Sequence, residues 1–236
     1  MKLSLQKYNL IIFDWDGTLV DSISSYKLWD KLYVHKFYNV DLPVEYFEEL
    51  ALDIKTVNIG GFDNRYFRYL DTKYGDGETP IDIIWDNIYS LSPNIQSKII
   101  YQKGAVEVLK LFRANTDAKL ALATNAEMRD MRYFSSSDSS TAQQLSPLDF
   151  FDTIVTIDYV EKPKPDPETF QKIISRYAVE PSKVLIFEDS LNGVMAGRAT
   201  GADVVAVFAD SVTKGQAHYT INSWGEILTM LTDDVS

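Results

Sequence analysis

The stretch YNLIIFDWDGTLVDS, Tyr8–Ser22, decides the fold of this chain. Its apolar run Leu10–Phe13 is typical of a strand that is buried on both faces, as in a parallel sheet. The run stops at Asp14, Asp16 follows two residues later, and Gly17 then allows the backbone to turn tightly. Ligands of open parallel sheets bind beyond the carboxyl ends of the strands, so both carboxylates are expected beside a ligand. An Asp-x-Asp pair by itself is equally compatible with an acidic turn that closes a strand.

Length, charge and composition exclude several classes of protein. The chain has 236 residues and a net charge of -11, which argues against a nucleic-acid or anionic-membrane surface, since both need clustered cations. The absence of cysteine excludes disulfides, thiolate metal sites and a cysteine nucleophile. No stretch reaches the roughly 18 to 20 apolar residues of a membrane span, and the N-terminal apolar run is too short for a signal peptide. We expect a soluble cytoplasmic protein without nucleic-acid or membrane partners; its oligomeric state is not indicated, and a monomer is compatible with the sequence.

Changes of periodicity along the chain indicate two domains. Residues 23–95 have apolar residues at helical spacing and no strand pattern, which predicts a helical insertion after the first strand. From Lys103 onward, buried strand patterns alternate with helical ones, which is typical of an α/β fold with a doubly wound parallel sheet. We expect a Rossmann-like core from residues 1–22 and 96–236, with 23–95 as an α-helical cap domain over its active-site edge. Later strands are expected at 119–123, 151–157, 184–187 and 203–207, and helices from 23 to about 37 and at 43–57, 63–74, 80–91, 103–114, 168–177, 190–199 and 224–231.

Two further segments bear on function. The Ser-rich segment 135–147 is polar and is expected to be a mobile loop. In the insertion, Asn58–Arg68 is the stretch expected to select the substrate. Arg65 and Arg68 could bind a second anionic group there, or they could be exposed helix charges or pair with the nearby Asp63 or Asp71.

Polar side chains follow several predicted strands at the point where each strand ends. Because parallel strands bring their carboxyl ends to one edge, these distant positions are expected to converge. Phosphoryl transfer needs a nucleophile, a proton donor and positive charge near the phosphoryl group, and an aspartate can be the nucleophile. Mg²⁺, which prefers oxygen ligands, and a lysine would supply the positive charge together. The side chains are Asp14 and Asp16, Thr124 and Asn125, Lys162 in a proline-rich loop, and Glu188 with Asp189.

Four motifs in chain order support phosphoryl transfer. Asp14–Asp21, DWDGTLVD, resembles the first motif, DxDGTxxD, of the haloacid dehalogenase superfamily. Leu122–Asn125 is similar to the second motif of that family, Glu161–Pro167 to the third, and Ile186–Gly193 to the fourth. Glu161 stands where members of the family usually have a small residue. The motifs resemble those of the phosphoglycolate phosphatase and β-phosphoglucomutase-like subfamily, whose members carry an α-helical cap.

This resemblance implies catalytic and metal-binding roles. Asp14 would be the nucleophile and a metal ligand. Asp16 would be the general acid and base, and would also bind the metal through its backbone carbonyl. Asp189, together with Glu188, would complete a Mg²⁺ site.

The resemblance also implies how phosphate is bound. Thr124 and Asn125 would bind the phosphoryl group through a hydroxyl and a backbone N–H, with Gly17 contributing in the first turn. Lys162 is assigned as the motif lysine, with catalytic and phosphate-binding roles, and Lys164 stands in the variable position. Simpler interpretations stay open for each alone, because Thr124 or Asn125 could cap the next helix and Lys162 could be a solvated loop lysine.

The competing functions differ in reaction type. A phosphatase would hydrolyse a small phosphorylated metabolite, of the phosphoglycolate or sugar-phosphate type. A sugar phosphomutase of the β-phosphoglucomutase type shares all four motifs, but the histidine of its pattern is replaced here by Tyr26. Asp16 disfavours a dehalogenase, and also a phosphonatase that would use a cap lysine such as Lys55. A non-catalytic binding protein would be expected to lack Asp14, Asp16 or Lys162, so the sequence favours the phosphatase.

Overall fold

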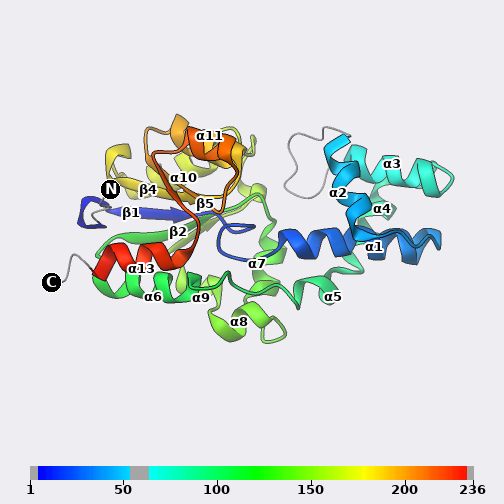
Figure 1. Cartoon of the computed structure of the whole chain (residues 1–236), viewed down its shortest axis with the longest axis horizontal. Helices are drawn as coiled ribbons and strands as arrows, with labels where there is room; N and C mark the ends of the chain where they lie inside the picture. Colours follow the sequence, from blue (N-terminus) through cyan, green and yellow to red (C-terminus); the bar gives the residue numbers. More distant parts are fainter. Residues whose placement is uncertain (1–4, 54–63, 233–236) are drawn as a thin grey trace. The chain divides into compact units, whose positions relative to one another are not determined.

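The computed structural model describes residues 5–53 and 64–232 of the chain (Figure 1). The chain divides into two compact units, one formed by Met1–Asp21 with Ile100–Ser236 and the other by Ser22–Ile99. The predicted insertion, 23–95, falls inside the second unit. None of the helices in the described part of the chain is long and apolar enough to cross a lipid bilayer.

A parallel sheet with the strand order β3-β2-β1-β4-β5-β6 forms the centre of the first unit. The chain runs outward from β1 to β3, and then returns to the other side of β1 for β4 to β6. The switch point of the topology therefore lies between β1 and β4, where ligands of such sheets bind. Every residue of β1 and β4 is buried, which accounts for their continuous apolar runs. The strands are β1 (Leu10–Phe13), β2 (Lys119–Ala123), β3 (Thr153–Val155), β4 (Val184–Glu188), β5 (Asp203–Val207) and β6 (Tyr219–Ile221).

Helices cover both faces of this sheet, which confirms the predicted doubly wound α/β fold (Figure 1). α10 (Glu168–Tyr177) and α11 (Leu191–Ala199) lie on one face, and α6 (Ala105–Asn115) and α13 (Trp224–Thr232) lie on the other. The side chains that fill the first face are mostly aliphatic, with Phe170 among them, and a group of aromatic rings packs on the second. The rings of the second face belong to Phe13, Phe112, Phe187 and Trp224.

The Ser-rich segment 135–147 differs from the expected loop. It contains the short helix α8 (Ser140–Gln144) and the start of α9 (Pro147–Phe150). Ser139 is fully buried, and its Oγ accepts the backbone N–H of Thr141 at 3.2 Å, so its polar side chain caps a helix. Other elements of this unit are α7 (Met128–Phe134), α12 (Ser211–Gln216) and the 3₁₀ turns Leu5–Lys7, Ile157–Tyr159 and Pro181–Lys183.

Backbone pairing joins the two points where the chain leaves and re-enters the first unit. Val20 and Tyr101 form an antiparallel bridge, and the N–H of Asp21 donates to the carbonyl of Ile100 at 3.0 Å. Both connections therefore begin from one paired segment.

The second unit is helical, with an aromatic core. Trp29 and Tyr33 of the first helix lie inside this core, where they are buried together with Phe47 and Phe67. The indole N–H of Trp29 donates to the carbonyl of Ile88 at 2.9 Å. The helices are α1 (Ile23–Tyr38), α2 (Val44–Asp53), α3 (Asn64–Tyr74), α4 (Ile81–Tyr89) and α5 (Ser92–Gln96).

Arg68 takes part in a polar network inside this second unit. Its guanidinium donates to Oδ2 of the fully buried Asp71 at 3.1 Å and to the backbone carbonyl of Thr79. The hydroxyl of Tyr38 donates to Oδ1 of the same aspartate at 3.0 Å. These contacts agree with the charge-pairing interpretation of Arg68. The side chain of Arg65, Lys55 and most of Asn58–Arg68 lie outside the described part of the chain.

Candidate active site

The turn after β1 holds the first two aspartates. The carbonyl of Trp15 accepts the N–H of Leu19 at 2.9 Å, which closes the turn directly after Asp14. Gly17 has a φ of 76°, in the left-handed region that favours glycine, and its N–H donates to the carbonyl of Val20 at 3.0 Å. The backbone donor of Gly17 is thus used to build the turn, and its predicted part in phosphate binding stays a prediction.

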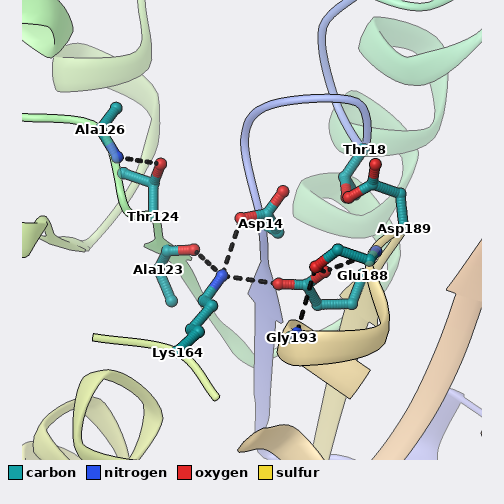
Figure 2. A network of polar contacts seen from close by, with 10 residues as sticks. Asp14, Thr18, Ala123, Thr124, Ala126, Lys164, Glu188, Asp189 and Gly193 are labelled. Carbon is teal, nitrogen blue, oxygen red and sulfur yellow. Dashed lines mark hydrogen bonds and ion pairs between the residues drawn. The ribbon is translucent and has the colours of Figure 1, made fainter. Parts of the chain in front are cut away.

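Lys164, and not Lys162, is the lysine at the strand ends (Figure 2). Its Nζ lies 2.7 Å from Oδ1 of Asp14, 2.7 Å from Oε1 of Glu188 and 2.9 Å from the carbonyl oxygen of Ala123. The side chain of Lys164 is buried, whereas Lys162 is exposed. The structure therefore brings Lys164, and not the predicted Lys162, to the edge of the sheet where Asp14 and Glu188 lie.

The proline-rich loop explains why the sequence pointed to the other lysine. The segment Lys162–Pro167, KPKPDP, contains the pattern Lys-Pro-x-Pro in two registers that differ by two residues. In the structure, the carboxylate of Glu168 accepts the backbone N–H groups of Glu161 and Lys162, the latter at 2.9 Å. These bonds hold the start of the loop at the surface, so the second lysine enters the site.

Three carboxylates meet at this edge of the sheet. Asp14, Glu188 and Asp189 place one carboxylate oxygen each within 4.8 Å of one another. Burial, and then the charge of Glu188, raises the pKa of Asp14 above its usual value, although Lys164 acts in the opposite direction. Burial likewise raises the pKa of Asp189, with the charges of Glu188 and Asp14 adding to it. Burial would lower the pKa of Lys164, but the two adjacent carboxylates raise it, so this lysine is charged.

The donor set of this cluster fits a Mg²⁺ ion. Three carboxylates face one lysine, so the buried cluster carries surplus negative charge. Burial, and then this charge, raises the pKa values of Asp14 and Asp189. A divalent cation with oxygen ligands would offset this charge. The cluster contains three of the four predicted metal ligands; the fourth, Asp16, was expected to bind through its backbone carbonyl.

A glycine makes room for the carboxylate of Glu188. Its Oε2 accepts the backbone N–H of Ser190 at 3.1 Å and the hydroxyl at 3.0 Å, while Oε1 accepts from Lys164. Ser190 Oγ accepts the N–H of Gly193 at 3.1 Å. A Cβ atom on Gly193 would lie 1.8 Å from the carboxylate carbon of Glu188, so only glycine fits there.

Thr18 connects the turn after β1 to the fourth strand. It is fully buried, and its hydroxyl donates to Oδ1 of Asp189 at 3.1 Å. Sequence reasoning included this threonine in the first motif without giving it a role. Asp16, in the same turn, is half-buried, and its charge contributes to the raised pKa of Asp14.

Thr124 and Asn125 follow β2 on the same edge of the sheet. Oγ1 of Thr124 accepts the N–H of Ala126 at 3.0 Å, which leaves the hydroxyl hydrogen to donate elsewhere. α7 is capped by Glu127 instead, so Thr124 does not cap that helix. Within the described residues, the buried Oδ1 of Asn125 has no hydrogen-bond partner. Both residues therefore keep polar groups that a ligand could engage.

Comparisons with known proteins point to one family. The sequence profile of haloacid dehalogenase-like hydrolases matches residues 8–201. A phosphorylated carbohydrates phosphatase from Thermotoga maritima is 24% identical over 218 residues, which cover 88% of this chain and 88% of that protein. A phosphoglycolate phosphatase from Nitrosospira multiformis is 26% identical over 204 residues, which cover 84% of this chain and 82% of that protein.

A solved structure agrees with the fold. A Thermotoga maritima protein provisionally named a β-phosphoglucomutase matches with a TM-score of 0.77 and 22% identity, over 95% of this chain and 99% of that one. An identity this low shows a shared fold alone. The profile match is more specific, because it runs from the residues before β1 to the end of α11 and includes the ends of β1, β2 and β4 that carry the site. The chain belongs to the haloacid dehalogenase-like hydrolases.

Proposed function

We propose that this protein is a Mg²⁺-dependent phosphatase that hydrolyses a small phosphorylated metabolite through an aspartyl-phosphate on Asp14. The observation that carries the proposal is the buried contact of Lys164 with both Asp14 and Glu188. This contact fixes a carboxylate at the end of β1, at the switch point of the sheet. A fixed carboxylate beside a charged lysine is what a nucleophile needs when its target is a phosphate dianion.

Asp14 and Asp16 divide the chemistry between them. Lys164 holds Oδ1 of Asp14, which leaves the second carboxylate oxygen for attack on phosphorus. As that bond forms, the bond from phosphorus to the substrate oxygen breaks, and Asp16 donates its proton to the departing oxygen. Asp16 then takes a proton from the water that attacks the aspartyl-phosphate, so inorganic phosphate leaves and Asp14 is restored.

Positive charge and hydrogen-bond donors stabilise the transferred phosphoryl group. Lys164 supplies one charge, and Thr124 and Asn125 supply donors from the end of β2. Asp14, Asp16, Glu188 and Asp189 would hold Mg²⁺. When bound, Mg²⁺ offsets negative charge on the phosphoryl oxygens.

The names of two relatives support a proposal for the substrate class. The Thermotoga maritima relative is named for phosphorylated carbohydrates, and the Nitrosospira multiformis relative is named for phosphoglycolate. Each aligns with more than four fifths of this chain. We therefore propose a sugar phosphate or phosphoglycolate as the substrate. Both are small, acidic monoesters of the kind a single aspartate nucleophile can dephosphorylate.

A sugar phosphomutase is the second candidate, because the chain shares its fold with a protein provisionally named for that activity. A mutase must return the phosphoryl group to a second sugar hydroxyl and exclude water. The histidine of the mutase pattern is replaced by Tyr26. In the second unit, the centroid of the Tyr26 ring lies 6.1 Å from that of Trp29. Tyrosine, with a reference pKa of about 10, is a poorer base near neutrality than histidine at about 6.5. This difference favours hydrolysis.

The test measures phosphate released from a panel that contains phosphoglycolate and several sugar phosphates. We expect release with Mg²⁺, its loss in a chelator, and its return when Mg²⁺ is restored. No release from any monoester, or release that the chelator leaves unchanged, would contradict the proposal. Glucose 1-phosphates are incubated alone and with the matching bisphosphate, and rapid isomerisation with little free phosphate would establish the mutase instead.

A further inference from the structure

The first residue of α13 contacts the turn after β1 from the far end of the sequence. The indole N–H of Trp224 donates to the carbonyl oxygen of Thr18 at 3.2 Å, across 206 residues of chain. Both side chains are fully buried. No motif includes Trp224, and sequence reasoning gave it only a place in the last helix.

The ring of Trp224 also packs against the residues that precede two of the site carboxylates. Its centroid lies 5.3 Å from that of Phe187, directly before Glu188, and 6.2 Å from that of Phe13, directly before Asp14. A large ring in this position restricts the ends of both β1 and β4.

The hydrogen bonds continue from Trp224 to the third carboxylate. Thr18 accepts from Trp224 through its backbone carbonyl, and its hydroxyl donates to Oδ1 of Asp189 at 3.1 Å. The side chain of Asp189 is thus oriented by a residue whose own backbone is held by the indole. Hydrogen bonds that orient a ligand from outside the coordination sphere tune metal affinity.

We propose that Trp224 is a positioning residue for the metal site, and that it acts through Thr18 to hold Asp189 in the orientation that binds Mg²⁺. The inference rests on the proposed function because it concerns the same site. It goes further by assigning a role to a side chain of α13.

The main experiment compares Trp224→Phe with a matched control. Trp224→Phe keeps an aromatic ring and removes the N–H donor. Trp29→Phe removes an equivalent buried indole donor, which bonds to the carbonyl of Ile88 in the second unit. Mg²⁺ binding to the full chain is measured by isothermal titration calorimetry without substrate, and thermal unfolding is measured without metal.

We expect both variants to lose thermal stability, since each removes a buried hydrogen bond from an indole N–H to a backbone carbonyl. In Trp29→Phe the carbonyl of Ile88 still accepts the N–H of Leu91. Only Trp224→Phe is expected to weaken Mg²⁺ binding, by roughly three- to tenfold. Equal Mg²⁺ affinities in the two variants would overturn the inference and leave Trp224 with a packing role.

A second comparison tests the route through Thr18. Thr18→Val removes the hydroxyl and is expected to weaken Mg²⁺ binding, whereas Thr18→Ser keeps the donor and is expected to retain most of the affinity. Adding Trp224→Phe to Thr18→Val should then weaken binding little further. If the two losses multiply as independent effects, the route through Thr18 is wrong.

These outcomes are separable from the fate of the proposed function. A wild-type protein that binds Mg²⁺ but releases no phosphate would contradict the phosphatase proposal, and the calorimetric comparison would still decide the role of Trp224. A wild-type protein that binds no Mg²⁺ would overturn both.

Discussion

Nζ of Lys164 lies 2.7 Å from Oδ1 of Asp14, although 150 residues separate the two along the chain. Their side chains are only 3% and 10% exposed. Either charge would be costly to bury without the other, so the removal of one partner is expected to destabilise the folded protein. The same two residues therefore stabilise this edge of the sheet and supply the nucleophile and the positive charge of the proposed reaction.

Replacing the two neighbouring lysines should have very different effects. Lys164→Met is expected to lower phosphate release by about 100-fold or more, since it removes the charge beside the nucleophile. It should also lower the free energy of unfolding by about 3 kcal/mol, because two buried carboxylates lose their cation. Lys162→Met is the control, and we expect activity within about twofold of the wild type, as for other exposed charges. Steady-state kinetics and urea unfolding check both; a larger loss in Lys162→Met would restore the sequence-based assignment.

Asp14→Asn tests the nucleophile. The amide has nearly the same shape and keeps an oxygen that can accept from Lys164, so we expect a folded protein with an unchanged circular dichroism spectrum. Turnover should fall by about 1000-fold or more, because an amide is a poor nucleophile. Phosphate release by a preparation whose substitution is confirmed by mass spectrometry is the measurement, and substantial residual turnover would rule out the aspartyl-phosphate.

Gly193→Ala should damage the site from within a helix. The added Cβ would fall 1.8 Å from the carboxylate carbon of Glu188, so that carboxylate must move away from Lys164. A displacement of this size is expected to reduce activity by about 10- to 100-fold. Gly215→Ala is the matched control, because no atom lies within 4 Å of its added Cβ.

A second change should partly rescue Gly193→Ala. Glu188→Asp shortens the side chain and withdraws it from the added methyl group. The double variant is therefore expected to be more active than Gly193→Ala alone. Independent, multiplying losses in kcat/KM would show that the glycine serves the helix and not the carboxylate.

The environment of His218, at the end of the sheet opposite the candidate site, predicts how the free energy of unfolding depends on pH. Its Nδ1 accepts the backbone N–H of Val204 at 3.1 Å, and burial, followed by the charge of Arg198, lowers its pKa below 6.5. The folded protein thus binds this proton less readily than the unfolded chain. The contribution to stability is complete above about pH 6.5 and declines as the pH falls below it.

His218→Asn offers a direct check, because Oδ1 of asparagine can accept the same N–H and does not titrate. Urea unfolding is measured at about pH 7.5 and about pH 5, on either side of the reference pKa of about 6.5. The free energy of unfolding should fall less in the variant than in the wild type as the pH is lowered. If the free energy of unfolding depends on pH identically in the wild type and the variant, His218 does not contribute to that dependence.

The sequence predicted the sheet well where strands are buried on both faces. β1, β2 and β4 are continuous apolar runs, and their bounds agree with the expected ones to within one residue. β6 (Tyr219–Ile221) was missed, because a short edge strand has only one neighbour and leaves Thr220 exposed. The segment 135–147 was mistaken for a loop since its serine and threonine side chains serve as caps and buried groups, which composition does not reveal.

The candidate site was predicted in its carboxylates but not in its lysine. Asp14, Glu188 and Asp189 end buried strands, and the topology of a parallel sheet is enough to bring them together. Lys162 and Lys164 share one local pattern, and the choice between them depends on how Glu168 binds the loop backbone. Contacts such as that of Trp224 with the turn depend on packing between distant elements, for which the sequence carries no local signal.

The bridge between Val20 and Tyr101 has a consequence for how this protein can evolve. Together with the bond from Asp21 to Ile100, it holds the two ends of the inserted segment 22–99 beside each other through hydrogen bonds that belong to the first unit. The entropy of closing a chain segment grows only slowly with its length, so segments of very different size fit between ends that are already joined. The bridge thus marks a position at which one insertion can be exchanged for another in evolution, while the site residues of the first unit are inherited unchanged.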